Sequence, residues 1–193
     1  MTVHPPHSAL TRQEQWLKGY YFVRAAFSAA WVAAALTVGQ QSSSIAATLL
    51  LAYPAWDAVA NYVDALCNGG LGENRTQALN VFVSFATTVA IVLALRMSMN
   101  SVVGVFGAWA LLAGLLQLGT AVRRWKIYGA QWAMVLSGGQ SALAGGFFIA
   151  NARLPTPPSI ANLAGYAAVG AFYFLISAMW LTATGLSRKS ART

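Results

Sequence analysis

Charged side chains are scarce in this chain. They make up 8% of its 193 residues, whereas hydrophobic residues make up 58%. A typical soluble domain uses about 25% charged residues to cover its surface. This imbalance excludes an ordinary soluble globule. A membrane-spanning helix takes about 20 mostly apolar residues, so the chain has room for about six such helices and their loops.

Cysteine and histidine are almost absent. The single cysteine, Cys67, excludes an intramolecular disulfide and a cysteine-based zinc cluster. The two histidines, His4 and His7, both belong to the N-terminal tip, so no apolar run contains a histidine base. The sequence also contains no phosphate-binding loop and no nucleophile with a partner histidine. We therefore predict a protein that is not an enzyme and that needs no metal and no cofactor.

The chain has a net charge of +8, which in a soluble protein suggests a nucleic-acid partner. Here the basic residues stand singly or in threes at the ends of apolar runs. That distribution is typical of residues that orient helices in a membrane. We expect membrane lipids, and no nucleic acid, as partners, and the sequence leaves open whether the chain forms a homo-oligomer.

Six apolar runs predict an all-α membrane bundle of six transmembrane helices. Polar, glycine-rich or proline-rich segments separate them, including 39–43, 67–72 and 155–158. The bundle follows a polar N-terminal tail, 1–17, and precedes a basic C-terminal tail, 187–193. A faint repeat of paired consecutive helices further predicts three helical hairpins. The expected spans are 18–38, 44–65, 78–97, 101–122, 129–150 and 160–186.

The basic residues also predict the orientation of the bundle. With a cytoplasmic N-terminus, ten Lys and Arg residues fall on the cytoplasmic side, and only Arg96 and Arg153 on the other. The positive-inside rule then places both termini in the cytoplasm. Three of the ten residues stand beside aromatic residues at the expected boundary and are predicted to contact anionic lipid headgroups: Arg123, Arg124 and Lys126.

The second apolar run carries a polar stripe. Tyr53, Asp57, Asn61 and Asp64 stand at positions i, i+4, i+8 and i+11, which places them on one face of a helix. The other positions of this run are mostly Ala, Val and Leu. Ionisable groups inside a membrane helix are expensive and are candidates for function.

Arg24 is the expected partner of Asp57. The two residues lie ~9 Å and ~10 Å along their helices from the same membrane surface, and helices joined by a short link pack as antiparallel neighbours. Asn80 and Ser84 on the third run extend this candidate polar site. Two interpretations stay open: the ion pair fixes how the helices pack, or Asp57 is a proton- or cation-responsive carboxylate that faces a polar cavity.

Small residues recur at helical spacing in the fourth and fifth runs. Such stripes let helix backbones approach closely in a membrane. We therefore predict helix packing at Ala110, Gly114, Gly138, Ala142 and Gly146.

Three segments resemble the HdeD family of small bacterial inner-membrane proteins: the run 107–118, the basic loop 123–125 and the run 132–139. The similarity covers helices four to six best. It implies six transmembrane helices built from a short repeated unit, a location in the bacterial cytoplasmic membrane, and an association with acid resistance. It carries over no catalytic residue.

Two functions follow as expectations. The first is a non-enzymatic membrane protein of HdeD type in the acid or envelope stress response. The alternative is a small channel or transporter for protons, cations or a small solute, which uses Asp57 paired with Arg24.

Overall fold

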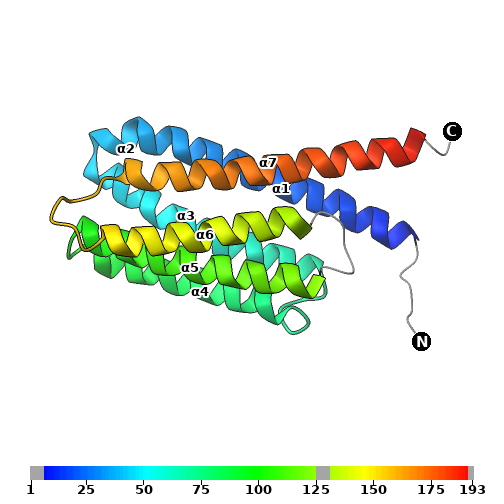
Figure 1. Cartoon of the computed structure of the whole chain (residues 1–193), viewed down its shortest axis with the longest axis horizontal. Helices are drawn as coiled ribbons and strands as arrows, with labels where there is room; N and C mark the ends of the chain where they lie inside the picture. The colour runs from blue at the N-terminus through cyan, green and yellow to red at the C-terminus, as the bar shows by residue number, and fades with distance from the viewer. Residues whose placement is uncertain (1–6, 125–130, 191–193) are drawn as a thin grey trace.

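The computed structural model describes residues 7–124 and 131–190, and the side chains of residues 15–122 and 135–185. These residues form helices and no strand, so the predicted all-α class is confirmed (Figure 1). Six helices are long, and α2 is a single turn that overlaps the expected polar break. The helices are α1 (His7–Leu36), α2 (Val38–Gln41), α3 (Ser43–Cys67), α4 (Arg75–Ala94), α5 (Met99–Arg124), α6 (Gln131–Asn151) and α7 (Ile160–Ser190).

The ends of the helices follow local chemistry. Ser42 caps α3 by accepting a hydrogen bond from the backbone N–H of Ile45. After Cys67 the chain turns through Gly69 and Gly70, whose φ angles of 97° and 89° favour glycine. The helix α1 begins at His7, earlier than the expected start at residue 18, because no proline or glycine interrupts the polar segment before the apolar run.

Four helical segments are long and apolar enough to cross a membrane: Gln15–Gln41, Arg75–Ala94, Met99–Val122 and Ile160–Gly185. The helix α3 is not among them, since Pro54 and the polar stripe lower its hydropathy. The first side chains of α6 lie outside the described residues. The membrane character predicted from composition is therefore supported by four helices, and six spans remain a proposal.

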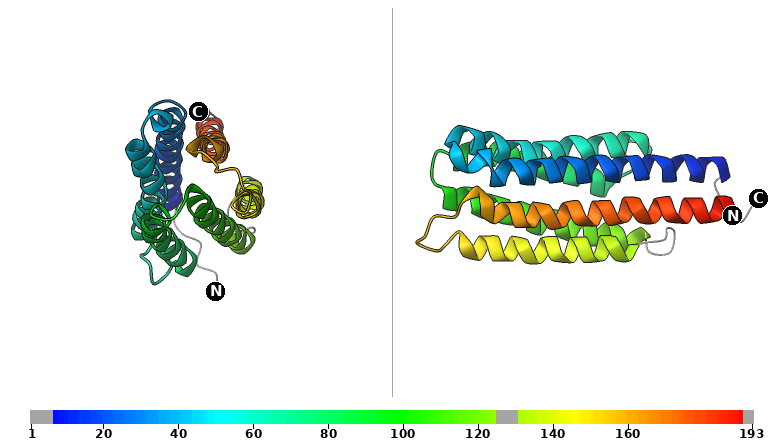
Figure 2. Two further views of the ribbon diagram at one scale, coloured as in Figure 1. Left: turned by 90° about the vertical axis from the view of Figure 1, so that its left-hand side faces the viewer. Right: turned by 90° about the horizontal axis from the view of Figure 1, so that it is seen from above.

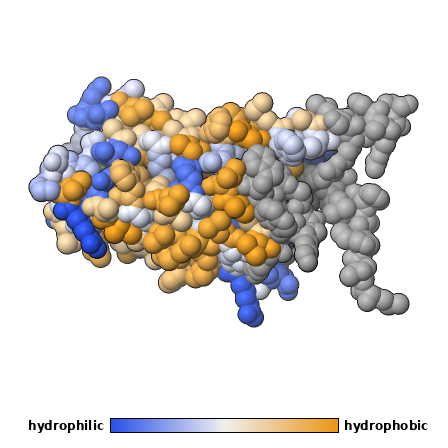
Figure 3. Space-filling view, in the orientation of Figure 1, coloured by the Kyte–Doolittle hydropathy of each residue, from blue (hydrophilic) through white to orange (hydrophobic). Residues whose placement is uncertain are grey.

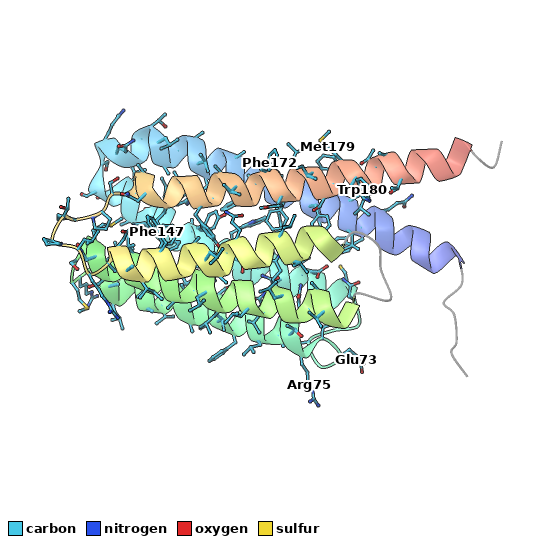
Figure 4. The ribbon with its side chains drawn as sticks, in the orientation of Figure 1. Glu73, Arg75, Phe147, Phe172, Met179 and Trp180 are labelled. Carbon is cyan, nitrogen blue, oxygen red and sulfur yellow. The ribbon has the colours of Figure 1, made fainter. Side chains whose placement is uncertain are left out.

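The outer surface of the bundle is strongly apolar. Phe82, Leu143 and Phe147 are 66%, 79% and 62% exposed, and Phe172 and Trp180 are also exposed along α7 (Figure 4). Apolar side chains cover most of the middle of the face seen in Figure 3, and hydrophilic ones gather towards its left-hand end. A soluble protein rarely exposes so much contiguous apolar surface, whereas lipid would cover it.

The helices pair differently from the three consecutive hairpins that the sequence predicts. The most extensive contacts join α5 to α6, α1 to α7, and α3 to α4, whereas α6 and α7 touch sparsely. In the end-on view, the last helix, α7, therefore lies next to the first, α1 (Figure 2). The predicted pairing is wrong because α4 packs more extensively on α3 than on α5, and α7 packs on α1 rather than on α6. Complementary helix surfaces decide this pairing, and a repeat in the sequence does not reveal them.

Glycine makes the contact between α5 and α6 close. A methyl group added at Gly145 would lie 2.4 Å from the backbone nitrogen of Leu111, and one at Gly114 would lie 2.6 Å from that of Ala142. Gly138 packs in the same seam against Gly114. The prediction for Gly146 is wrong by one position.

Gly146 is exposed and has open space around it. Gly145, seven residues after Gly138, is the residue that faces α5. Spacings of four and seven keep residues on one helix face, whereas two steps of four drift away from it. Ala110 is fully buried on the α5 side, and Ala142 contacts Gly114, as the small-residue pattern predicts.

The apolar core occupies only one half of the bundle. It gathers the C-terminal halves of α1, α4 and α6 and the N-terminal halves of α3, α5 and α7. These halves meet at the end opposite to the one where α1 begins and α7 ends (Figure 1). The largest fully buried apolar side chains there are Leu50, Ile91, Val102, Val103, Phe106 and Leu163.

We predict opposite effects for two adjacent glycines in detergent. Gly145→Ala should destabilise the protein by about 1–3 kcal/mol, since the methyl group collides with backbone that cannot move independently. Gly146→Ala should leave stability unchanged or raise it by up to about 1 kcal/mol, because alanine favours helix. Thermal unfolding of the two purified variants checks this, and equal destabilisation would contradict the packing of this seam.

Candidate functional site

Arg24 of α1 and Asp57 of α3 form an ion pair in the bundle interior, as the register of the two helices predicts. Their side chains are only 14% and 10% exposed. The second guanidinium nitrogen of Arg24 donates to the hydroxyl of Tyr20, one helical turn earlier, at 2.9 Å. Each charge thus has a partner in an environment where an isolated charge would be strongly disfavoured.

The other carboxylate oxygen of Asp57 accepts two further hydrogen bonds. Asn61 donates to it from the next turn of α3 at 2.9 Å, and Ser84 of α4 donates at 2.8 Å. The indole N–H of Trp109, on α5, donates to the Ser84 hydroxyl at 3.0 Å. One carboxylate therefore connects four helices through a single chain of polar contacts.

Aromatic rings flank the guanidinium group of Arg24. Its central carbon lies 4.4 Å from the ring centre of Phe174 on α7 and 5.6 Å from that of Tyr20. Both distances are within the range of a cation–π interaction. Arg24 is therefore held by a carboxylate on one helix and by an aromatic ring on another.

Asp64 lies two turns beyond Asp57 on the same face of α3. Its carboxylate accepts hydrogen bonds from Trp16 at 3.2 Å, from Asn68 at 2.9 Å and from Gln77 at 2.6 Å. These donors come from α1, from the loop after α3 and from α4. Asp64 is thus buried in a junction of three chain segments near the end of the helix.

A cavity of about 150 Å³ lies among the helices beside these carboxylates. All six long helices contribute to its wall, which combines charged, amide and hydroxyl groups with aromatic rings. The polar and charged members of the wall are Arg24, Ser28, Asp57, Asn61, Asp64, Gln77, Asn80, Gln117, Thr120, Ser137, Gln140, Ser141 and Ser177. Its aromatic members are Tyr20, Tyr21, Tyr53, Trp56, Trp109, Tyr166, Tyr173 and Phe174.

The structure brings most of the predicted polar site to this cavity. The residues that line it are Arg24, Tyr53, Asp57, Asn61, Asp64 and Asn80. Ser84 is fully buried behind Asp57, where it holds the carboxylate in place. The polar stripe on α3 thus faces inward along its whole length.

Apart from Tyr53, sequence reasoning missed the aromatic part of the wall. The i, i+4 spacing of Tyr20 and Arg24 is a usable signal, because that spacing puts the hydroxyl within reach of the guanidinium group. Phe174 and Tyr166 carry no such signal, since nothing in the sequence says that α7 packs against α1. Tyr166 completes the wall through a hydrogen bond of 2.8 Å between its hydroxyl and that of Ser141.

The predicted lipid contacts of Arg123, Arg124 and Lys126 lie outside the side chains that the structure describes. Within the described part of the chain, no group of three or more His, Cys, Asp or Glu residues is placed to hold a metal ion.

Comparison of the chain with models of known protein families, with curated proteins and with solved structures gives no significant match. The similarity to the HdeD family and the stress role that it implies stay predictions.

We predict strong coupling between Arg24 and Asp57. Arg24→Met or Asp57→Asn alone leaves a buried charge without its partner and should destabilise the protein by roughly 3–5 kcal/mol. The double variant removes both charges and should be more stable than either single variant. Thermal unfolding of all four proteins in the same detergent forms a double-mutant cycle, and additive losses would show that the two groups do not interact.

Proposed function

We propose that the protein is an integral membrane carrier that binds a small polar solute in its central cavity, with Arg24 and Asp57 as the binding groups. The observation that carries the proposal is the cavity itself, whose wall includes a paired arginine and aspartate deep in an otherwise apolar bundle. Polar and ionisable groups at membrane depth are costly, and they characteristically mark the pathways of solutes or ions. An ion pair needed only for packing requires no cavity beside it.

The position of the cavity favours a carrier over an open channel. The cavity lies in the half of the bundle where α1 begins and α7 ends, and the opposite half is filled by the apolar core. Phe106, Leu163 and Val103 in that core are each 1% exposed. A continuous pore would need polar or wet surface through both halves, whereas a carrier closes one half at a time.

The proposal includes six membrane spans with both termini in the cytoplasm of a bacterium. The helices α1 and α7 have their outer ends at the same end of the bundle (Figure 1). The opposite end carries Arg96 and Arg153, whereas Arg75, at the start of α4, lies towards the end with the termini (Figure 4). The cavity then faces the cytoplasm.

Orientation can be tested with the single native cysteine. Cys67 is exposed at the end of α3, so a membrane-impermeant maleimide should label it in inverted membrane vesicles but not in intact spheroplasts. Met97 is 75% exposed at the opposite end, and Met97→Cys in a Cys67→Ser background should give the reverse pattern. Labelling of both positions from the same side would contradict the six-span arrangement.

Transport can be tested in proteoliposomes. We expect wild-type protein to accumulate a radiolabelled polar solute from a mixed panel, or to couple its flux to protons as read by a pH-sensitive dye. Asp57→Asn should lower the rate at least about tenfold, since it removes the charge that pairs with Arg24.

Glu73→Gln is the matched control for this experiment. It makes the same chemical change at an exposed loop position outside the cavity (Figure 4), and it should transport at the wild-type rate. Size-exclusion chromatography establishes that each variant is folded before reconstitution. An absence of flux for every solute and gradient with folded wild-type protein would refute the carrier function.

A further inference from the structure

The ion pair restricts what the carrier can bind. Arg24 and Asp57 neutralise each other, and both are buried. The third charged residue of the wall, Asp64, lies two turns further along α3, where its carboxylate accepts from Trp16, Asn68 and Gln77. An anionic ligand that binds Arg24 leaves Asp57 without a countercharge. A cationic ligand that binds Asp57 likewise leaves Arg24 without a countercharge. Either outcome is strongly unfavourable in a low-dielectric site. A ligand that carries both charges replaces the ion pair between Arg24 and Asp57 by two new pairs, one between its anionic group and Arg24 and one between its cationic group and Asp57.

Two buried polar atoms in the wall match such a ligand. The indole nitrogen of Trp56 and the side-chain oxygen of Asn80 are buried, and neither has a hydrogen-bond partner among the described residues. Both residues line the cavity. A buried donor and a buried acceptor without partners are rare in native proteins, and each such group calls for an explanation.

The two atoms belong to residues that line the same cavity as the ion pair and neighbour its partners along the helices. Trp56 directly precedes Asp57 on α3, and Asn80 lies one turn before Ser84, which donates to Asp57. The indole N–H acts only as a donor, from which a carboxylate can accept, and the amide oxygen acts only as an acceptor, to which an ammonium group can donate. The wall therefore offers two donor residues, Arg24 and Trp56, and two acceptor residues, Asp57 and Asn80.

The volume and the aromatic wall set the size of the ligand. A cavity of about 150 Å³ is comparable to an engineered protein cavity that binds benzene. The rings of Tyr53, Trp109 and Tyr166, which pack against one another at centroid distances of 5.8 Å and 6.4 Å, form an apolar part of the wall. That surface suits a short aliphatic group.

We propose that the solute is a small zwitterion, an α-amino acid with a short apolar side chain, whose carboxylate binds Arg24 and Trp56 and whose ammonium group binds Asp57 and Asn80. This proposal rests on the carrier function above and names its substrate class. Under this proposal, lipids, inorganic ions and singly charged organic molecules are not substrates of the carrier.

Probes that share a branched isobutyl group test the charge requirement. L-Valine carries both charges, isovalerate lacks the ammonium group, isobutylamine lacks the carboxylate, and isovaleramide is neutral. Isothermal titration calorimetry on the full-length wild-type protein in detergent measures the binding of each, with glycine as a second zwitterion. We expect a zwitterion to bind saturably and the three other probes to bind at least about tenfold more weakly.

Each result decides between the two proposals. Equal or tighter binding of isovalerate, isobutylamine or isovaleramide would overturn the zwitterion and leave a carrier of another class. Failure of both L-valine and glycine to bind, with solute flux present in proteoliposomes, would also overturn the zwitterion alone. Failure of all probes together with an absence of flux would overturn the carrier function as well.

A second variant keeps the test independent of the ion pair. Trp56→Phe keeps an aromatic ring that can stack on Phe27, 4.6 Å away in the wild type, and removes the unpartnered N–H together with the five-membered ring that carries it. It should weaken L-valine binding about three- to tenfold.

Trp180→Phe is the matched control, because Trp180 is 49% exposed and does not line the cavity (Figure 4). It should leave the affinity for L-valine unchanged. Unchanged affinity in Trp56→Phe would refute the proposed position of the carboxylate.

Discussion

The ion pair between the buried side chains of Arg24 and Asp57 is the interaction on which the arrangement of the helices depends. Neither Arg24 nor Asp57 is stable alone among apolar helices, so α1 and α3 are fixed in the one register that joins them. The remaining lone pairs of the carboxylate then require donors, which Asn61 and Ser84 provide, and Ser84 in turn accepts from Trp109. A single electrostatic constraint thus extends over four helices and holds polar side chains around a common space.

The two halves of the bundle are built on different principles. One half is a packed apolar core, and the other encloses a cavity with a polar and aromatic wall. Along one side, the glycine seam brings the backbones of α5 and α6 close enough that no side chain could intervene. By contrast, α6 and α7 touch sparsely. This pattern divides the bundle into tightly joined helix pairs, and relative movement of such pairs is how carriers alternate access to a site.

Aromatic side chains give the cavity its mixed character. Tyr20 contacts Arg24 through its hydroxyl group and its ring, Phe174 through its ring alone. Tyr53 joins these groups to the apolar core, since its ring packs edge-on against Trp109 while its hydroxyl lies 3.4 Å from that of Ser28. The wall is therefore neither wholly polar nor wholly apolar. It offers charge and apolar surface within one small volume, which is the combination that an amphiphilic solute requires.

The sequence by itself determined the all-α class, the six long helices, the inward polar stripe on α3 and the partnership of Arg24 with Asp57, because each follows from composition or from helical periodicity within one or two neighbouring segments. Only the tertiary structure decided that α7 packs on α1, that Gly145 rather than Gly146 faces α5, and that Phe174 covers the guanidinium group. Those features depend on the rotation and pairing of helices far apart in the chain. Uniformly apolar helices carry little periodic signal to specify that pairing, so side-chain shape and close backbone contact decide it.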